Sequence, residues 1–123
     1  MTLASFSDER DRLALARPDL LREAAYIDGR WAQGGQTHIA SNPATGRPIA
    51  AVPHLGRAEA EAAVQAAHAA FPSWSALTGK QRSAILRRWH ALIEVHADDL
   101  ARLMTAEQGK PLAEAKGEIV YAG

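Results

Sequence analysis

Three residues in the second half of the chain have side chains that could bind a metal ion. His90 and Glu94 are four residues apart in a segment with helical periodicity, and His96 follows two residues later. Imidazole nitrogens and carboxylate oxygens are common zinc ligands. The same periodicity places His96 on the apolar face of the helix and His90 off that face. The three side chains therefore do not converge, and we do not expect a zinc site.

Glu107 is a second candidate for chemistry. It continues the series Leu100, Leu103 and Met104 at helical spacing, so it projects from the face that is expected to be buried. A buried carboxylate needs a hydrogen-bond donor or a cation, because burying it unpaired is costly. Two interpretations remain open. Either the helix end is exposed and Glu107 contacts water or an end-of-helix amide, or the carboxylate points inward and holds another segment or a cation.

The sequence contains no complete catalytic or nucleotide-binding motif. It has no glycine-rich phosphate loop, no Gly-x-Ser-x-Gly motif and no cysteine. The lack of cysteine excludes disulfides, thiolate metal sites and a cysteine nucleophile within these residues. Any chemistry of the cysteine type would therefore have to come from another chain or segment.

The balance of charge excludes two classes of partner. The 14 basic residues equal the 14 acidic residues, so we expect neither a nucleic acid nor an anionic membrane as partner. Four basic residues gather in one stretch, which we interpret as the solvated face of a helix: Lys80, Arg82, Arg87 and Arg88.

No apolar run approaches the length of about 20 residues that spans a bilayer. The N-terminus resembles no secretory or transit signal, so we expect a cytoplasmic protein.

The first 53 residues divide into a helical arm and a region of strands. In the arm, residues 1–24, the pattern predicts a short helix over 7–17, with Asp8 and Glu9 near its positive end. Pro18 interrupts that helix. Residues 25–53 have the texture of strands and turns.

Two turns organise the strand region. Asp28-Gly29 between apolar residues predicts a hairpin. Asn42-Pro43-Ala44-Thr45-Gly46 predicts a tight turn in which the Asn42 side chain bonds forward to the backbone. A return strand is expected over 48–52, and Pro53 is expected to end it.

Residues 57–123 have the period of helices. The first of these helices is expected to close at Pro72, and Thr78 with Gln81 predicts a capping box for the second. Asp98 or Asp99 is expected to cap the third, which Gly109 stops. Pro111 opens a fourth, which has no stop signal before the sequence ends.

The apolar faces of the predicted helices consist largely of small side chains, because alanine supplies 27 residues of the chain. A core this poor in large side chains leaves apolar faces without partners. We therefore expect the isolated chain to be loosely packed or prone to aggregation.

Four segments resemble the N-terminal region of the aldehyde dehydrogenase superfamily in order and approximate spacing. They are Ile27-Asp28-Gly29-Arg30-Trp31, Asn42-Pro43-Ala44-Thr45-Gly46, Ala70-Phe71-Pro72-Ser73-Trp74 and Glu107-Gln108-Gly109-Lys110-Pro111. The resemblance runs from about Tyr26 to the end of the chain. Residues 100–118 look like the succinate-semialdehyde dehydrogenase branch, to which glutarate-semialdehyde dehydrogenases are very similar there.

The resemblance implies oxidation of an aldehyde to a carboxylate with NAD or NADP, for example of succinate semialdehyde in the breakdown of 4-aminobutyrate (GABA). In that family a cysteine attacks the carbonyl, hydride passes to the coenzyme, and a glutamate activates the water that hydrolyses the thioester. These residues lie downstream of residue 123 in the family. We therefore assign no catalytic and no coenzyme-binding residue here, and we expect this chain alone to be inactive and to bind no coenzyme.

The resemblance also implies one cation site. Several family members hold a monovalent cation between a carbonyl just before the Asn-Pro turn and an acidic residue just before Gly-Lys-Pro. By motif position these are Ala40 or Ser41 and Glu107. The family often has aspartate at the second position, and a further ligand would come from downstream.

The expected fold class is α/β. It is the N-terminal portion of the aldehyde-dehydrogenase-like fold: short antiparallel strands followed by several helices, in an incomplete doubly wound domain. We expect a chain truncated at its C-terminus, whose partners are the remainder of the dehydrogenase chain and further copies in a homo-oligomer. The alternative is a non-catalytic module that docks onto an intact dehydrogenase or another partner.

Overall fold

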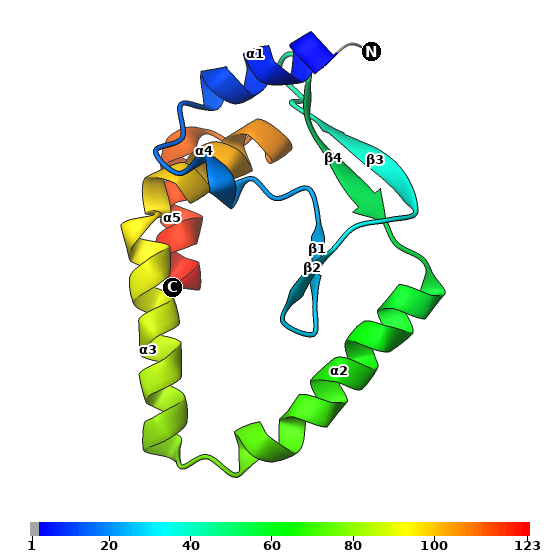
Figure 1. Ribbon diagram of the computed structural model, residues 1–123. Coiled ribbons are helices and arrows are strands. Elements are labelled where there is room, and N and C mark those ends of the chain that lie inside the picture. Colours follow the sequence, from blue (N-terminus) through cyan, green and yellow to red (C-terminus); the bar gives the residue numbers. More distant parts are fainter. Residues whose placement is uncertain (1–2) are drawn as a thin grey trace.

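The computed structural model describes residues 3–123, and the side chains of residue 6 and of residues 8–123. Two small antiparallel sheets and a series of helices follow one another along the chain (Figure 1). In chain order the elements are α1 (Leu3–Leu13), the 3-10 helix η1 (Pro18–Leu20), β1 (Ala25–Ile27), β2 (Arg30–Ala32), β3 (Gln36–Ser41), β4 (Pro48–His54), α2 (Arg57–Ser75), α3 (Gly79–Val95), α4 (Ala97–Gln108) and α5 (Leu112–Ala122). The expected order of short antiparallel strands followed by helices is confirmed.

The predicted Asp-Gly hairpin is present. Asp28 and Gly29 have φ values of 52° and 72° and join β1 to β2. A two-residue hairpin of type I′ requires positive φ at both central residues, and its backbone matches the twist of the flanking strands. Tyr26 lies opposite Trp31, and their rings meet edge to face with centroids 5.1 Å apart. This cross-strand aromatic pair stabilises a hairpin that has only three residues in each strand.

The second hairpin pairs β3 with β4 and corrects one prediction. Pro53 does not end the return strand: it lies within β4 opposite Thr37, and the strand continues to His54. β4 has one neighbour in this two-stranded sheet. A nitrogen that faces away from that neighbour needs no partner in the ladder, and proline is tolerated in edge strands for this reason.

The helix of the N-terminal arm is displaced from its predicted position. It was expected over 7–17 but spans Leu3–Leu13 and stops where Ala14 adopts a φ of 48°. Because the helix starts earlier, Glu9 lies in its interior rather than at its positive end. The η1 turn that begins at Pro18 follows. The arm thus bends back over the strands and α4 (Figure 1).

Proline fails to close α2. Pro72 was expected to end the helix, but it lies inside α2, which continues to Ser75. The missing N–H of a proline costs one hydrogen bond of the helix, and near the end of a helix few residues depend on that bond. The next helix begins as predicted, since Thr78 and Gln81 form a capping box. Within residues 3–123, no helix combines the length and the hydrophobicity needed to cross a membrane.

Neither Asp98 nor Asp99 caps α4, contrary to prediction. The helix begins at Ala97 with His96 as its N-cap residue, so both aspartates lie in its first turn. The Asp99 carboxylate instead accepts hydrogen bonds from the backbone N–H groups of Ala16 (3.0 Å) and Arg17 (2.8 Å). It is only 6% exposed. Asp99 therefore links α4 to the arm through these two hydrogen bonds, which we call the clamp. The predicted end of α4 at Gly109 is confirmed by the φ of 80° of this residue.

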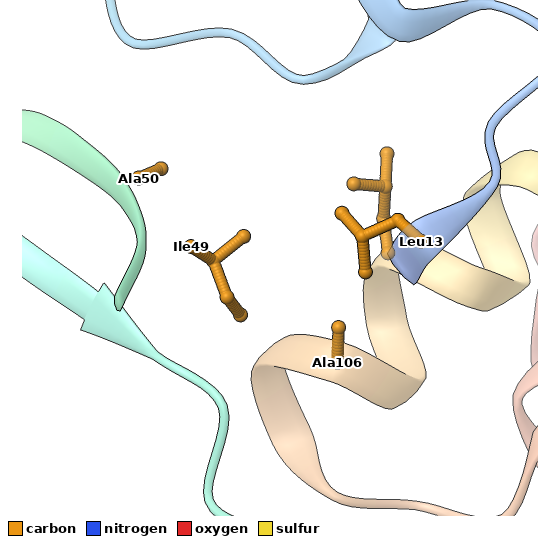
Figure 2. Close-up of a cluster of buried hydrophobic side chains, with 5 residues drawn as sticks. Leu13, Ile49, Ala50 and Ala106 are labelled. Atoms are coloured by element: carbon orange, nitrogen blue, oxygen red, sulfur yellow. The ribbon is translucent and has the colours of Figure 1, made fainter. Parts of the chain in front are cut away.

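A small apolar core forms where the arm, β4 and α4 meet. Leu13 of the arm, Ile49 of β4 and Ala106 of α4 point toward one another (Figure 2), and Ala50 and Leu103 complete the cluster. Leu15, Leu20 and Leu21 of the arm pack against it. The core of the described residues therefore depends on the arm, which lies mostly before the segment that carries the family resemblance.

The faces of α2 and α3 remain open. In Figure 1, α2 leads away from the sheets and α3 returns to α4. Large apolar residues on both helices are exposed: Val64, Phe71, Trp74, Ile85, Leu86, Trp89 and Leu92. The expectation that the chain leaves apolar faces without partners is confirmed for the residues described. Hydrophobic burial therefore stabilises one end of the structure much more than the other.

Two ion pairs hold α5, one to α4 and one to the segment that precedes α5. Lys116 donates to the Asp98 carboxylate at 2.5 Å, and Lys110 pairs with Glu118. The hydrogen bond from Lys116 is the main reason that the pKa of Asp98 lies below its ordinary value. Because Lys116 and Asp98 are both exposed, their pair contributes little to stability.

Replacing Asp99 by alanine tests the clamp. Asp99→Ala removes an acceptor from two backbone N–H groups, so we expect a loss of about 2 kcal/mol of unfolding free energy. Asp98→Ala is the matched control, because it removes a neighbouring carboxylate that makes an exposed pair, and it should cost less than about 1 kcal/mol. Urea denaturation of both variants measures the difference. Equal losses in the two variants would contradict the role given to Asp99.

Candidate functional site

The candidate site lies where β3 ends. Ser41 is the last residue of β3, and the pairing with β4 is irregular between Ala40 and Ser41. Such an irregularity re-aims backbone groups at the end of a strand. Ala40 is half-buried and Ser41 is exposed. The regular pairing of β3 with β4 is therefore interrupted at the position where the sequence predicts a carbonyl ligand.

The turn that follows Ser41 is held by its own hydrogen bonds. The Asn42 N–H donates to the Arg47 carbonyl at 2.8 Å, and the Gly46 N–H donates to the Asn42 carbonyl at 2.7 Å. The Asn42 side chain accepts from the Ala44 N–H at 2.9 Å, which confirms the predicted forward bond. This network fixes the path of the backbone immediately after Ser41.

The C-terminal end of α4 touches this turn. The Gly109 N–H donates to the Thr105 carbonyl at 2.8 Å, and a Cβ placed on Gly109 would lie 2.9 Å from Cγ of Pro43. Glu107 is two residues before Gly109, in the last turn of α4. The fold thus brings the segments that carry the two predicted ligand positions, Ser41 and Glu107, to one junction.

Glu107 itself is exposed. The residues that α4 buries are Asp99, Ala101, Leu103 and Ala106, whereas Leu100 and Met104 are half-buried. The buried face of α4 therefore lies farther from Glu107 than the apolar periodicity predicts, because the arm and β4 cover a different side of the helix. The helix end is exposed, as the first of the two interpretations of Glu107 expects, and the ligand of this carboxylate stays a prediction.

The chemistry of this junction suits a hard cation. Backbone carbonyl and carboxylate oxygens are the ligands that such cations prefer. Among the described residues there is no group of three or more histidine, cysteine, aspartate and glutamate side chains that could hold a metal ion. A cation here would therefore depend on the Ala40 or Ser41 carbonyl, the Glu107 carboxylate and ligands from outside the described residues.

The other sequence candidates lie away from this junction. His90 Nε2 and Glu94 Oε2 of α3 are 3.3 Å apart, and both side chains are largely exposed. His96 is half-buried at the start of α4, where it is the N-cap residue. The first two residues contact each other as an i, i+4 pair, which is the usual arrangement on a helix surface.

Sequence reasoning missed Glu9. This carboxylate is only 2% exposed, and its Oε1 atom accepts hydrogen bonds from Asn42 Nδ2 at 2.8 Å and Thr45 Oγ1 at 3.1 Å. It borders a shallow pocket of about 210 Å³ that Thr105 and Leu112 also line. The available signal was its spacing of four residues from Leu13, which puts both side chains on one face of α1.

A substitution at Gly109 tests the contact between α4 and the turn. Gly109→Ala introduces a Cβ at a φ of 80° and within 2.9 Å of Pro43, so we expect a loss of about 1–2 kcal/mol of unfolding free energy. Gly117→Ala is the control, because a Cβ at Gly117 meets nothing within 4 Å and alanine favours the helix. Thermal unfolding of both variants measures the effect. An unchanged melting temperature for Gly109→Ala would contradict the contact.

Comparison with known proteins extends these observations. The sequence pattern described as "Aldehyde dehydrogenase family" matches residues 31–123. A glutarate-semialdehyde dehydrogenase of Pseudomonas putida is 57% identical over 89% of this chain and 23% of its own length. The Escherichia coli protein named succinate-semialdehyde dehydrogenase [NADP(+)] GabD is 54% identical over 85% of this chain and 22% of its own length.

The fold agrees with the sequence comparison. A crystal structure of succinate-semialdehyde dehydrogenase from Burkholderia pseudomallei matches 89% of this chain and 23% of its own chain, with 50% identity and a TM-score of 0.86. The chain thus spans about a fifth of the length of these relatives. The matched pattern covers most of the chain, from within β2 through β3, β4 and α2 to α5. The chain belongs to the aldehyde dehydrogenase family.

Proposed function

We propose that this chain is the N-terminal part of an NAD(P)-dependent dehydrogenase that oxidises succinate semialdehyde or glutarate semialdehyde to the dicarboxylate. The observation that carries the proposal is identity above 50% to two relatives whose names state these activities. The coenzyme is inferred in the same way, since one of those names specifies NADP(+). The shared chemistry of the two substrates is an aldehyde with a carboxylate at its far end.

In this proposal the described residues form a supporting frame. The open faces of α2 and α3 are where the remainder of the dehydrogenase chain would pack. Trp89 and Leu92 of α3 are 64% and 60% exposed, and Val64 of α2 is 69% exposed. Burying such a side chain contributes about 1.5–3 kcal/mol, so an apolar surface that covers both helices would stabilise the frame substantially.

The activity is tested by comparing two products of the gene. The first is the polypeptide made from the complete reading frame that contains this chain, and the second is residues 1–123 alone. We expect the first to reduce NAD+ or NADP+ with succinate or glutarate semialdehyde, and the second to show no turnover, because no cysteine is present in it. Absorbance of the reduced coenzyme at 340 nm measures both.

Three other results would change the proposal. Turnover by residues 1–123 alone would overturn the assignment of catalysis to other residues. Inactivity of the complete product toward all aldehydes would overturn the enzymatic function. An inactive product that binds tightly to an intact dehydrogenase would favour the alternative, a docking module, which the open helix faces would equally serve.

We further propose that the junction of β3 and α4 binds a monovalent cation. The backbone carbonyl of Ala40 or Ser41 and the carboxylate of Glu107 would be its ligands in this chain. The contact between Gly109 and Pro43 supports the proposal, because it holds the two ligand segments next to each other. A cation there would link the end of a strand to the end of a helix and so stabilise the frame.

Removing the Glu107 charge tests the cation site. In the complete protein, replacing choline chloride by KCl at constant ionic strength should raise the melting temperature, because a ligand that binds only the folded state stabilises it. Glu107→Gln should lose most of this K+-specific rise. Glu94→Gln is the matched control, since Glu94 is exposed on α3 and pairs with His90. A full K+ response in Glu107→Gln would contradict the site.

A further inference from the structure

The buried carboxylate of Glu9 makes contacts that the proposed enzymatic function does not use. Transfer of a carboxylate from water to a site that is 2% exposed is costly unless hydrogen bonds replace the lost hydration. Oε1 receives two such bonds, from the side chains of Asn42 and Thr45. Oε2 is buried without a hydrogen bond, and the Arg12 guanidinium lies 3.7 Å from it. The strongest contacts of Glu9 are therefore directed at the turn between β3 and β4.

Both donors belong to the five-residue turn that follows Ser41. The Asn42 side chain is used twice: Oδ1 accepts from the Ala44 N–H, and Nδ2 donates to Glu9. Thr45 Oγ1 likewise donates to Glu9 and accepts from the Arg47 N–H at 3.3 Å. One carboxylate thus orients the first and the fourth side chain of the turn. Hydrogen bonds to an ionised acceptor are about twice as strong as neutral ones.

Apart from its own hydrogen bonds, the turn has little support from other elements. Residues 43–47 are exposed, and Asn42 is half-buried. The contact of Pro43 with the end of α4 at Gly109 is apolar and has no directional preference. The hydrogen bonds from Asn42 and Thr45 to Glu9 are therefore the directional tether of this turn to another element.

We propose that Glu9 is a positioning residue for the cation site. Its carboxylate holds the turn, and with it the Ala40–Ser41 end of β3, next to the end of α4 that carries Glu107. Glu9 does not bind the cation. This proposal rests on the proposed cation site, and it assigns a role in that site to the N-terminal arm, which precedes the residues matched by the family pattern.

The arm offers a matched control in Glu23. Glu23 is another carboxylate of the arm. Its Oε1 atom accepts a hydrogen bond from the Ala51 N–H at 2.7 Å and forms an ion pair with Arg10 at 2.5 Å. Its contacts tie the arm to the middle of β4 and not to the turn. Loss of Glu23 therefore loosens the arm while leaving the bonds of Asn42 and Thr45 intact.

The experiment measures K+ affinity in the complete protein from the dependence of the melting temperature on KCl, with choline chloride keeping the ionic strength constant. Loss of charge-assisted hydrogen bonds should raise the half-saturating K+ concentration of Glu9→Ala about tenfold or more. Glu23→Ala should stay within about twofold of the wild type, since its carboxylate does not reach the turn. Thr45→Val removes one of the two bonds and should shift K+ affinity in the same direction as Glu9→Ala but by less.

Hydrogen exchange gives a second readout that does not need the cation. The amides of Asn42 and Gly46 close the turn, and they should exchange faster in Glu9→Ala and Thr45→Val than in Glu23→Ala. If Glu9→Ala does not fold, Thr45→Val still tests the proposal, because it removes the hydroxyl that donates to Glu9 and leaves Glu9 in place. Faster exchange together with weaker K+ binding supports the proposal.

The failures are distinguishable. A wild-type protein that responds to K+, with Glu9→Ala and Thr45→Val unchanged in affinity, overturns the role of Glu9 alone. Equal losses of affinity in Glu9→Ala and Glu23→Ala also overturn it, since they indicate a general effect of the arm. A wild type without any K+-specific response overturns both the cation site and this role, while leaving the dehydrogenase activity to its own assay.

Discussion

The Asp99 carboxylate joins two parts of the chain that are more than 80 residues apart, because it accepts the backbone N–H groups of Ala16 and Arg17. These two N–H groups lie after the end of α1, so no carbonyl of that helix accepts hydrogen bonds from them. By binding them, α4 fixes where the arm turns. Leu13 is then held against Ile49 and Ala106, and Glu9 reaches the turn after β3. The packing of the arm into the core and the contact of Glu9 with the turn both depend on this clamp.

Local patterns predicted most elements of the fold. Asp28-Gly29, the Asn42 turn, the Thr78 capping box and the stop at Gly109 each depend on residues within a few positions of one another, and the structure contains all four. The errors occurred where a distant contact decides the outcome. Aspartate is a residue type typical of helix caps, but Asp99 accepts hydrogen bonds from the backbone of the arm instead. No local pattern indicates which of the two neighbouring aspartates will contact a backbone segment that is distant in the sequence.

The candidate site shows the same division. Motif order located the segments of Ser41 and Glu107, and the fold brings these segments to one junction through Gly109 and Pro43. The exposure of Glu107 was not predictable from α4 alone, because it depends on which side of the helix the arm covers. Glu9 was not predictable either. Its burial arises from a helix that starts four residues earlier than the pattern indicated and from a turn more than 30 residues away.

The two hairpins have a consequence for assembly. Each sheet consists of two strands, so in the described residues one edge of every strand presents backbone N–H and C=O groups that no neighbouring strand receives. The six residues of β3 are long enough to act as a template for an incoming strand. On β4, by contrast, Arg10 donates to the Ile49 carbonyl and Glu23 accepts from the Ala51 N–H, so the arm already engages its backbone. Such edges can extend an existing sheet with backbone from the same protein or from another copy. Strand addition at β3 would thus couple the growth of a sheet to the core around Ile49, without any contribution from the open helices.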